Sequence, residues 1–340
     1  MTVCIAAIYN NNSVLGASDK MLSTDDIEFE PTDPQAKKIF NITNSAAIMT
    51  AGGSNIHAQI LPRVDSYVKQ RLAKEPTKWI PIIDIANAYR DAYIELRKEI
   101  AERAILYPYD LNYKTFIEKQ KIMNSKAVRD IAHRLEEFQF DYDEDIAAII
   151  AGVDDTPPPG IKNGPSPHIY VFSCGRVSCN DNVGFAAVGI GARHALSHLM
   201  LLGHSRFASE PETLVRVHRS KKKAEVSPGV GEKTDMFVIG PSPGSFNMLE
   251  PKENFKADIV KDLDKSYEST YKKGLAKLDE ADVKAAKDYL EKLFKENTPP
   301  QQASPTDHEI NVSDETKTKK EDNKENERKE PTGRTRRKTN

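Results

Sequence analysis

The sequence predicts an α+β protein: a four-layer αββα sandwich that carries a helical insertion and additional helices toward its C-terminus. The order of its hydrophobic patterns supports this prediction. Two β-hairpins come first, followed by two helices, further strands, two more helices and a final strand. The 340 residues exceed one typical domain of roughly 100–200 residues, which leaves room for the additions.

Two hairpins are predicted within the first fifty residues. Residues 3–8 and 14–17 are apolar and partly β-branched, and three asparagines between them suit a turn. A looser polar segment follows. Residues 37–42 and 46–50 then repeat the hairpin pattern across the turn Thr43-Asn44-Ser45.

Helices are expected after the glycine turn Ala51-Gly52-Gly53. Apolar residues recur at helical spacing from Ser54 onward, and a second stripe runs from about residue 80 to 104. These two helices should lie on a sheet. Residues 105–142, with a helical stretch at about 125–138, are interpreted as an insertion.

The pattern then returns to strands. We expect strands at residues 146–153, 168–172, 176–179, 184–191 and 234–239, helices at 192–202 and 211–223, and an exposed proline-rich loop at 157–160. The resulting division assigns residues 1–250 to a sheet-forming domain and 251–298 to a helical extension that docks or assembles. Residues 299–340 contain almost no apolar side chains, and we predict that they are disordered.

Composition excludes several classes of function. Lys and Arg total 49 against 51 Asp and Glu, so the net charge of −2 favours neither nucleic acid nor an anionic membrane as a partner. No apolar run approaches the roughly 18 residues of a membrane helix. The sequence contains three cysteines, Cys4, Cys174 and Cys179, and two of them lie in apolar or alternating runs that suit small buried residues. We therefore expect no disulfide and a cytoplasmic location.

Four short segments resemble the opening of β-type proteasome subunits in identity and order: Met1-Thr2-Val3-Cys4-Ile5, Ala17-Ser18-Asp19-Lys20-Met21, Ala36-Lys37-Lys38-Ile39 and Thr50-Ala51-Gly52-Gly53. The start is most similar to the bacterial relatives HslV and Anbu. The segments at residues 151–154, 167–170 and 187–191 resemble the central strands and glycine turn of this N-terminal-nucleophile (Ntn) hydrolase family. The resemblance covers residues 2–240, excluding about 105–142.

An N-terminal threonine can act alone, because its α-amine has a pKa of about 7.7–8.0 and can accept the hydroxyl proton near neutral pH. The resemblance implies that Thr2 is this nucleophile after removal of Met1. It also implies that Lys38 lies beside Thr2 and pairs with Asp19, and that Gly52 supplies an oxyanion N–H. Gly53 and Met21 are the expected substrate-binding residues.

The implied reaction is hydrolysis of a peptide or other amide bond through an acyl-threonine ester, with no metal or cofactor. The family's rings imply a homo-oligomer, and a regulatory protein is a possible partner. A non-catalytic structural or interaction subunit is the alternative, and an amidase acting on a small metabolite is a third.

Several departures favour the alternative. Ile190 stands where many catalytic relatives have serine, and Ser227 is only a candidate for the family's later serine. The additions at 105–142 and 251–298 are also unusual. Lys20, next to Asp19, could compete with Lys38 for its carboxylate.

Other motifs have simpler interpretations. His194 and His198 have the spacing of metal ligands but no evident third ligand, and Cys174 and Cys179 lack a matching pair, so we predict no metal site. Residues 229–234 resemble a phosphate loop but precede a strand. Lys221-Lys222-Lys223 and the basic residues of the tail, Arg334, Arg336, Arg337 and Lys338, are interpreted as solvated charge.

Overall fold

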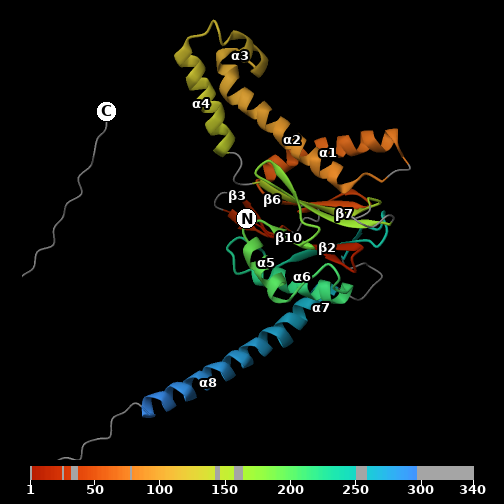
Figure 1. The fold of residues 1–340 in the computed structure, drawn as a ribbon, viewed down its shortest axis with the longest axis vertical. Coiled ribbons are helices and arrows are strands. Elements are labelled where there is room, and N and C mark those ends of the chain that lie inside the picture. The colour runs from red at the N-terminus through yellow and green to blue at the C-terminus, as the bar shows by residue number, and fades with distance from the viewer. Residues whose placement is uncertain are drawn as a thin grey trace, which may run out of the picture. The chain divides into compact units, whose positions relative to one another are not determined.

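Two antiparallel five-stranded sheets are the central feature of the structure (Figure 1). This computed structural model describes residues 2–24, 27–31, 37–76, 79–141, 146–156, 164–249 and 259–296. The chain divides into two units, Met1–Asp279 and Glu280–Asn340, and both sheets belong to the first. The α+β class predicted from the sequence is confirmed.

The first sheet has the strand order β10-β1-β2-β11-β12. Its members are β1 (Cys4–Tyr9), β2 (Ser13–Asp19), β10 (Phe185–Val188), β11 (Thr234–Ile239) and the short β12 (Asn247–Met248). The second sheet has the order β5-β6-β7-β8-β9. Its members are β5 (Ile39–Thr43), β6 (Ala46–Gly52), β7 (Ile146–Asp154), β8 (Ser166–Ser173) and β9 (Arg176–Cys179).

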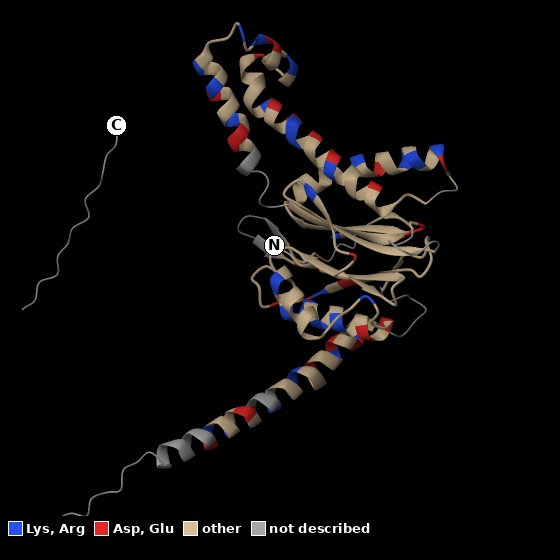
Figure 2. Cartoon of the chain, in the orientation of Figure 1, with Lys and Arg blue, Asp and Glu red and all other residues tan. Residues whose placement is uncertain are grey.

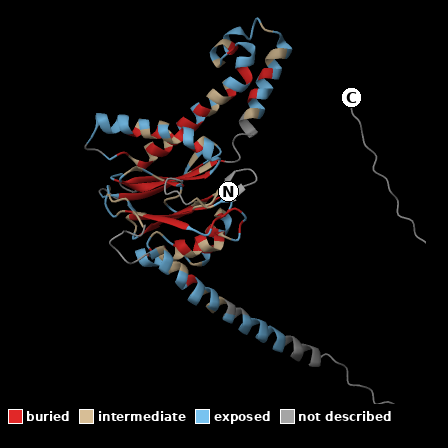
Figure 3. Cartoon of the chain, turned by 180° about the vertical axis from the view of Figure 1, so that it is seen from behind, coloured by how far each residue is buried: buried red, intermediate tan, exposed pale blue. Residues whose placement is uncertain are grey.

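The two sheets pack through a shared apolar cluster. Ile8 and Phe237 of the first sheet join Met49 and Ile149 of the second in this cluster, and all four are fully buried. Figure 3 shows that burial is concentrated in the strands. Because side chains alternate between the faces of a strand, the other face of each sheet remains available to helices.

Helices α1 (Ser54–Lys74) and α2 (Ile82–Ala101) pack on the second sheet, where Ile60, Tyr89 and Tyr93 join Ile48 and Phe172. On the first sheet, α5 (Ala192–Leu201) and α6 (Glu210–Ala224) contribute Leu199 and Val217 to a separate cluster. Ser209 and Glu212 form a capping box at the start of α6, with Pro211 in its first turn as expected. Charges of both signs follow the helices, whereas the strands are mostly uncharged (Figure 2).

The segment interpreted as an insertion follows α2, which continues into a π-helical turn, η1 (Glu102–Leu106), and a short 3₁₀ turn, η2 (Tyr107–Tyr109). Helices α3 (Tyr113–Lys119) and α4 (Ser125–Asp141) follow. Ile105, Phe116 and Ile131 contribute to a small apolar core of their own.

Three consecutive helical segments follow β12 toward the C-terminus. Helix α7 (Ile259–Ser266) continues through η3 (Tyr267–Lys272) into α8 (Lys273–Glu296). Val260 packs against the cluster beneath α6, and Tyr267 is 8% exposed, so this part is docked. In the second unit, Val283 is 65% exposed.

None of the described helices has the length and apolar character needed to cross a bilayer.

The polar segment after β2 differs from its prediction, because it forms a hairpin of β3 (Leu22–Thr24) and β4 (Ile27–Phe29). Strands of three residues are too short to produce a periodic signal. The predicted loop at residues 157–160 and the predicted tail at 299–340 lie outside the described residues.

Candidate active site

Thr2, Asp19 and Lys38 are in direct contact although they are distant in sequence. The Thr2 hydroxyl donates a hydrogen bond of 2.6 Å to Asp19 Oδ1. Lys38 Nζ donates to Thr2 Oγ1. The same ammonium lies 2.9 Å from both carboxylate oxygens of Asp19. The hydroxyl therefore lies between a positive and a negative group.

Strand pairing within each sheet and packing of the two sheets against each other produce this contact. Cys4 is paired with Ser18 in the β1–β2 register, and the N–H of Asp19 donates to the carbonyl of Val3 at 3.2 Å. Lys38 comes immediately before β5 of the other sheet, and its carbonyl accepts the N–H of Thr50 at 3.0 Å. The site therefore requires both sheets in their packed arrangement.

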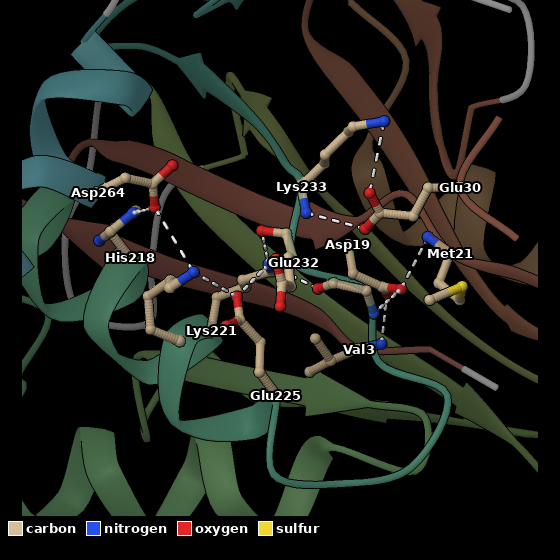
Figure 4. Close-up of polar contacts among 12 residues, drawn as sticks. Val3, Asp19, Met21, Glu30, His218, Lys221, Glu225, Glu232, Lys233 and Asp264 are labelled. Carbon is tan, nitrogen blue, oxygen red and sulfur yellow. Dashed lines mark hydrogen bonds and ion pairs between the residues drawn. The ribbon is translucent and has the colours of Figure 1, made fainter. Parts of the chain in front are cut away.

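Asp19 is fully buried, and backbone donors surround its carboxylate. Val3 N–H donates to Oδ1 at 2.8 Å, while Met21 N–H at 3.0 Å and Gly231 N–H at 3.1 Å donate to Oδ2. Figure 4 shows Val3 and Met21 directed at this carboxylate. Together with Lys38 and Thr2, these donors offset the free-energy cost of removing the carboxylate from water.

The glycine turn before α5 holds the backbone of Thr2. Gly191 N–H donates to the carbonyl of Thr2 at 3.3 Å. Gly189 has φ +91°, and a Cβ there would lie 2.8 Å from Thr2 Cγ2. Only glycine fits this approach without strain. Ile190, between the two glycines, is 49% exposed.

A cavity of about 240 Å³ borders Thr2. The predicted residues Lys38, Gly52 and Met21 line it, whereas Gly53 is exposed and does not. The remaining lining is largely apolar or aromatic: Leu22, Phe29, Lys37, Phe40, Thr50, Ser54, His57, Ala58 and Leu61. A side chain of a ligand bound at Thr2 can enter this space.

Gly52 lines the cavity, and Gly53 follows it directly at the start of helix α1. Gly52 has φ +97°, a backbone conformation that glycine adopts readily. Gly53 is the N-cap residue of α1, and its carbonyl accepts the N–H groups of Ile56 and His57. Its position explains the turn into α1.

His57 is a cavity residue that the sequence analysis missed. Its Nε2 lies 3.0 Å from the carbonyl of Ala51, so Nε2 carries the proton, and Nδ1 accepts the Tyr89 hydroxyl at 2.6 Å. Burial lowers the pKa of His57, which agrees with a neutral ring. The spacing of His57 from Ile60 and Val64, on the buried face of α1, was the available signal.

Cys4, two residues after Thr2, is a poor candidate for a second nucleophile. Burial raises the pKa of its thiol to about 12, and Sγ donates to the carbonyl of Thr50 at 3.4 Å. All three cysteines are free. Cys4 is buried as expected, whereas Cys174 and Cys179, beside and within edge strand β9, are exposed.

The structure excludes a competing role for Lys20, and it shows that the interpretation of Lys221 is wrong. Lys20 does not compete for Asp19, because it pairs with Asp235 on the neighbouring strand β11 at 2.6 Å. Lys221, interpreted as solvated, is fully buried in α6. It follows Val217 by four residues and precedes Ala224 by three, so it lies on the apolar face of its helix.

The remaining candidates lie apart from this contact. Ser227 is 7% exposed, but it is Gly231 of the same loop that reaches Asp19. His194 is exposed, and His198 is buried against Tyr271 with a ring separation of 6.2 Å. Within the described residues, no three His, Cys, Asp or Glu side chains form a group that could hold a metal ion.

Two comparisons with known proteins add no assignment to this site. A scan against models of protein families finds no match, and a search of curated proteins finds none either.

Proposed function

We propose that the protein is a threonine-type Ntn hydrolase that cleaves a peptide or other amide bond through an acyl-Thr2 ester after removal of Met1. The observation that carries this proposal is the direct contact of the Thr2 hydroxyl with both Lys38 and Asp19 in the wall of a cavity. A hydroxyl in direct contact with charged groups that can activate it is the arrangement that nucleophilic catalysis requires.

The fold part of the proposal is a four-layer αββα sandwich of the proteasome-subunit type. It is supported by three apolar clusters: one between the sheets, one beneath α1 and α2, and one beneath α5 and α6. By the same resemblance we propose a homo-oligomer that works in the cytoplasm, with a regulatory protein as a further partner.

The proposed reaction begins when the free α-amine of Thr2 takes the proton of its own hydroxyl. Oγ1 attacks the amide carbonyl, and the adjacent Lys38 ammonium stabilises negative charge on Oγ1 as it develops. We assign the N–H of Gly52 to the oxyanion. The amine product leaves with a proton from the Thr2 ammonium, and water then hydrolyses the acyl ester to release the acid and regenerate Thr2.

The cavity supports a preference for substrates with an apolar side chain next to the cleaved bond. Leu22, Phe40 and Leu61 line it, and the ring of His57 is held by Tyr89 and Ala51. Burial of apolar surface contributes about 25 cal/mol per Å², so an apolar side chain gains free energy by entering this space.

A non-catalytic structural or interaction subunit is the second candidate. It is favoured by Ile190, an exposed aliphatic residue in the turn that holds Thr2, where many catalytic relatives have a hydroxyl. An amidase for a small metabolite would use the same chemistry as a peptidase and differs only in substrate.

The test is covalent labelling combined with intact mass. A peptide epoxyketone reacts with both the hydroxyl and the α-amine of an N-terminal threonine, so an adduct at Thr2 requires that Met1 has been removed. We expect one adduct, abolished in Thr2→Val. The matched control Thr213→Val, which removes a fully buried hydroxyl from α6, should label normally. Retained Met1 or an unlabelled protein would favour the non-catalytic subunit.

A further inference from the structure

Lys221 is a fully buried cation with three oxygen partners, close to but outside the cavity at Thr2. Its ammonium donates to Glu225 Oε1 at 2.6 Å, to the carbonyl of Gly231 at 2.8 Å and to that of Glu232 at 2.6 Å. Three N–H donors thus meet three acceptors. A cation without exposure is tolerated only when it is paired and hydrogen-bonded in this way.

Gly231 links Lys221 to the candidate site. While its carbonyl binds Lys221, its own N–H donates to Asp19 Oδ2 at 3.1 Å. The peptide groups on both sides of its Cα are therefore held, which fixes the φ and ψ of the most flexible residue type. Figure 4 shows Lys221, Glu232 and Asp19 in this network.

A residue with a side chain would restrict the backbone at position 231, but there is no space for it. A Cβ at Gly231 would lie 2.9 Å from Met21 Cβ and 3.0 Å from Met21 N, and would also meet Glu30 Oε1. The position demands glycine, so the direction of its N–H depends on external contacts.

We propose that Lys221 is a positioning residue of the Thr2 site. By binding the carbonyls of Gly231 and Glu232, it fixes the Gly231 N–H on Asp19, and Asp19 in turn orients Lys38 and the Thr2 hydroxyl. The inference rests on the proposed hydrolase function. It extends the site from the cavity wall to the interior of α6.

The test compares Lys221→Met, which keeps the length and apolar stem but removes the ammonium, with Lys222→Met. Lys222 contacts the same Glu225 at 2.9 Å and also Asp264, but it makes no hydrogen bond to the carbonyls of Gly231 and Glu232 that bind Lys221. Both variants remove one positive charge from α6. We expect kcat and the rate of Thr2 labelling to fall roughly 10- to 100-fold in Lys221→Met, as for small displacements of reacting groups. KM should stay within about twofold, and Lys222→Met should resemble wild type.

Amine rescue provides a readout that a purely structural role would not move. A surface cavity of about 430 Å³ is lined by residues 225–232 with Met21 and Glu30, and these include the three residues that bind Lys221. Methylammonium should restore kcat in Lys221→Ala, which leaves space for it, but not in Lys221→Met. Lys221→Gln, with two neutral donors, covers the case in which Lys221→Met does not fold, and its kcat should be intermediate.

Amide hydrogen exchange separates failure of this inference from failure of the hydrolase proposal. Exchange in the peptide that spans residues 227–233 should quicken in Lys221→Met but not in Lys222→Met, whether or not the protein hydrolyses amides. An active wild type together with a Lys221→Met variant of unchanged kcat would overturn the positioning role, as would unchanged exchange in this peptide. An unlabelled, inactive wild type with quickened exchange would instead reject the hydrolase proposal and leave the Lys221 contact supported.

Discussion

Asp19 and Lys38 form a buried ion pair whose two halves should respond unequally to mutation. Asp19→Asn leaves the ammonium of Lys38, only 7% exposed, without its counter-ion. It also turns an amide NH₂ toward backbone N–H donors, because each carboxylate oxygen accepts at least one. Removing one partner of a buried pair typically costs about 3–5 kcal/mol, and we expect a loss of this size in the free energy of unfolding.

Lys38→Met should cost less. Asp19 keeps the N–H groups of Val3, Met21 and Gly231 and the hydroxyl of Thr2, so its carboxylate is still solvated by the protein. The expected loss is about 1.5–3 kcal/mol, the usual range for hydrogen bonds to a charged group. Both variants should lose Thr2 labelling.

Urea unfolding of wild type, the two single variants and the double variant measures these values as a double-mutant cycle. The double variant should be less destabilised than the sum of the singles, because Lys38→Met removes the charge that Asp19→Asn leaves unpaired. A loss in Lys38→Met equal to or larger than that in Asp19→Asn would refute this account of the pair.

Three further predictions test other parts of the structure. Gly189→Ala should lower the melting temperature and abolish Thr2 labelling, because its Cβ would lie 2.8 Å from Thr2 Cγ2; Gly203→Ala, also at positive φ but with open space around its Cβ, controls for backbone strain. The pKa of His168 reflects burial, which lowers it, and the opposing and larger effect of Asp154 and Asp181, which together raise it from 6.5 to about 9. The stabilising contribution of His168 should therefore be complete below about pH 6.5 and disappear as the pH rises through about 9, a difference of about 3 kcal/mol. Urea unfolding of wild type and His168→Gln at pH 6 and pH 10 should show the gap between them closing at high pH, and a gap that widens would contradict the assignment. Ala58→Phe should fill much of the cavity and raise KM for substrates with bulky apolar side chains, while a small electrophile still labels Thr2; an unchanged KM would place the substrate elsewhere.

The sequence by itself predicted the principal strands and helices and several of the residues brought together around Thr2. Periodicity predicts the two hairpins and the principal helices because alternation and helical spacing are local properties, and the resemblance selected Asp19, Lys38, Gly52 and Met21. Periodicity did not predict the hairpin of β3 and β4, because these strands are too short to show a repeating pattern.

Only the tertiary structure decided the partners of charged and polar side chains. Lys20 pairs with Asp235 because β2 and β11 are neighbours in the first sheet, although 215 positions separate the two residues in sequence. Lys221 is buried because carbonyls of a following loop turn back to its ammonium, and His57 is neutral because Tyr89 of α2 and Ala51 of β6 meet its two nitrogens. A charge run has the same local pattern whether it is solvated or paired. The difference arises from acceptors that only chain folding brings within hydrogen-bonding distance.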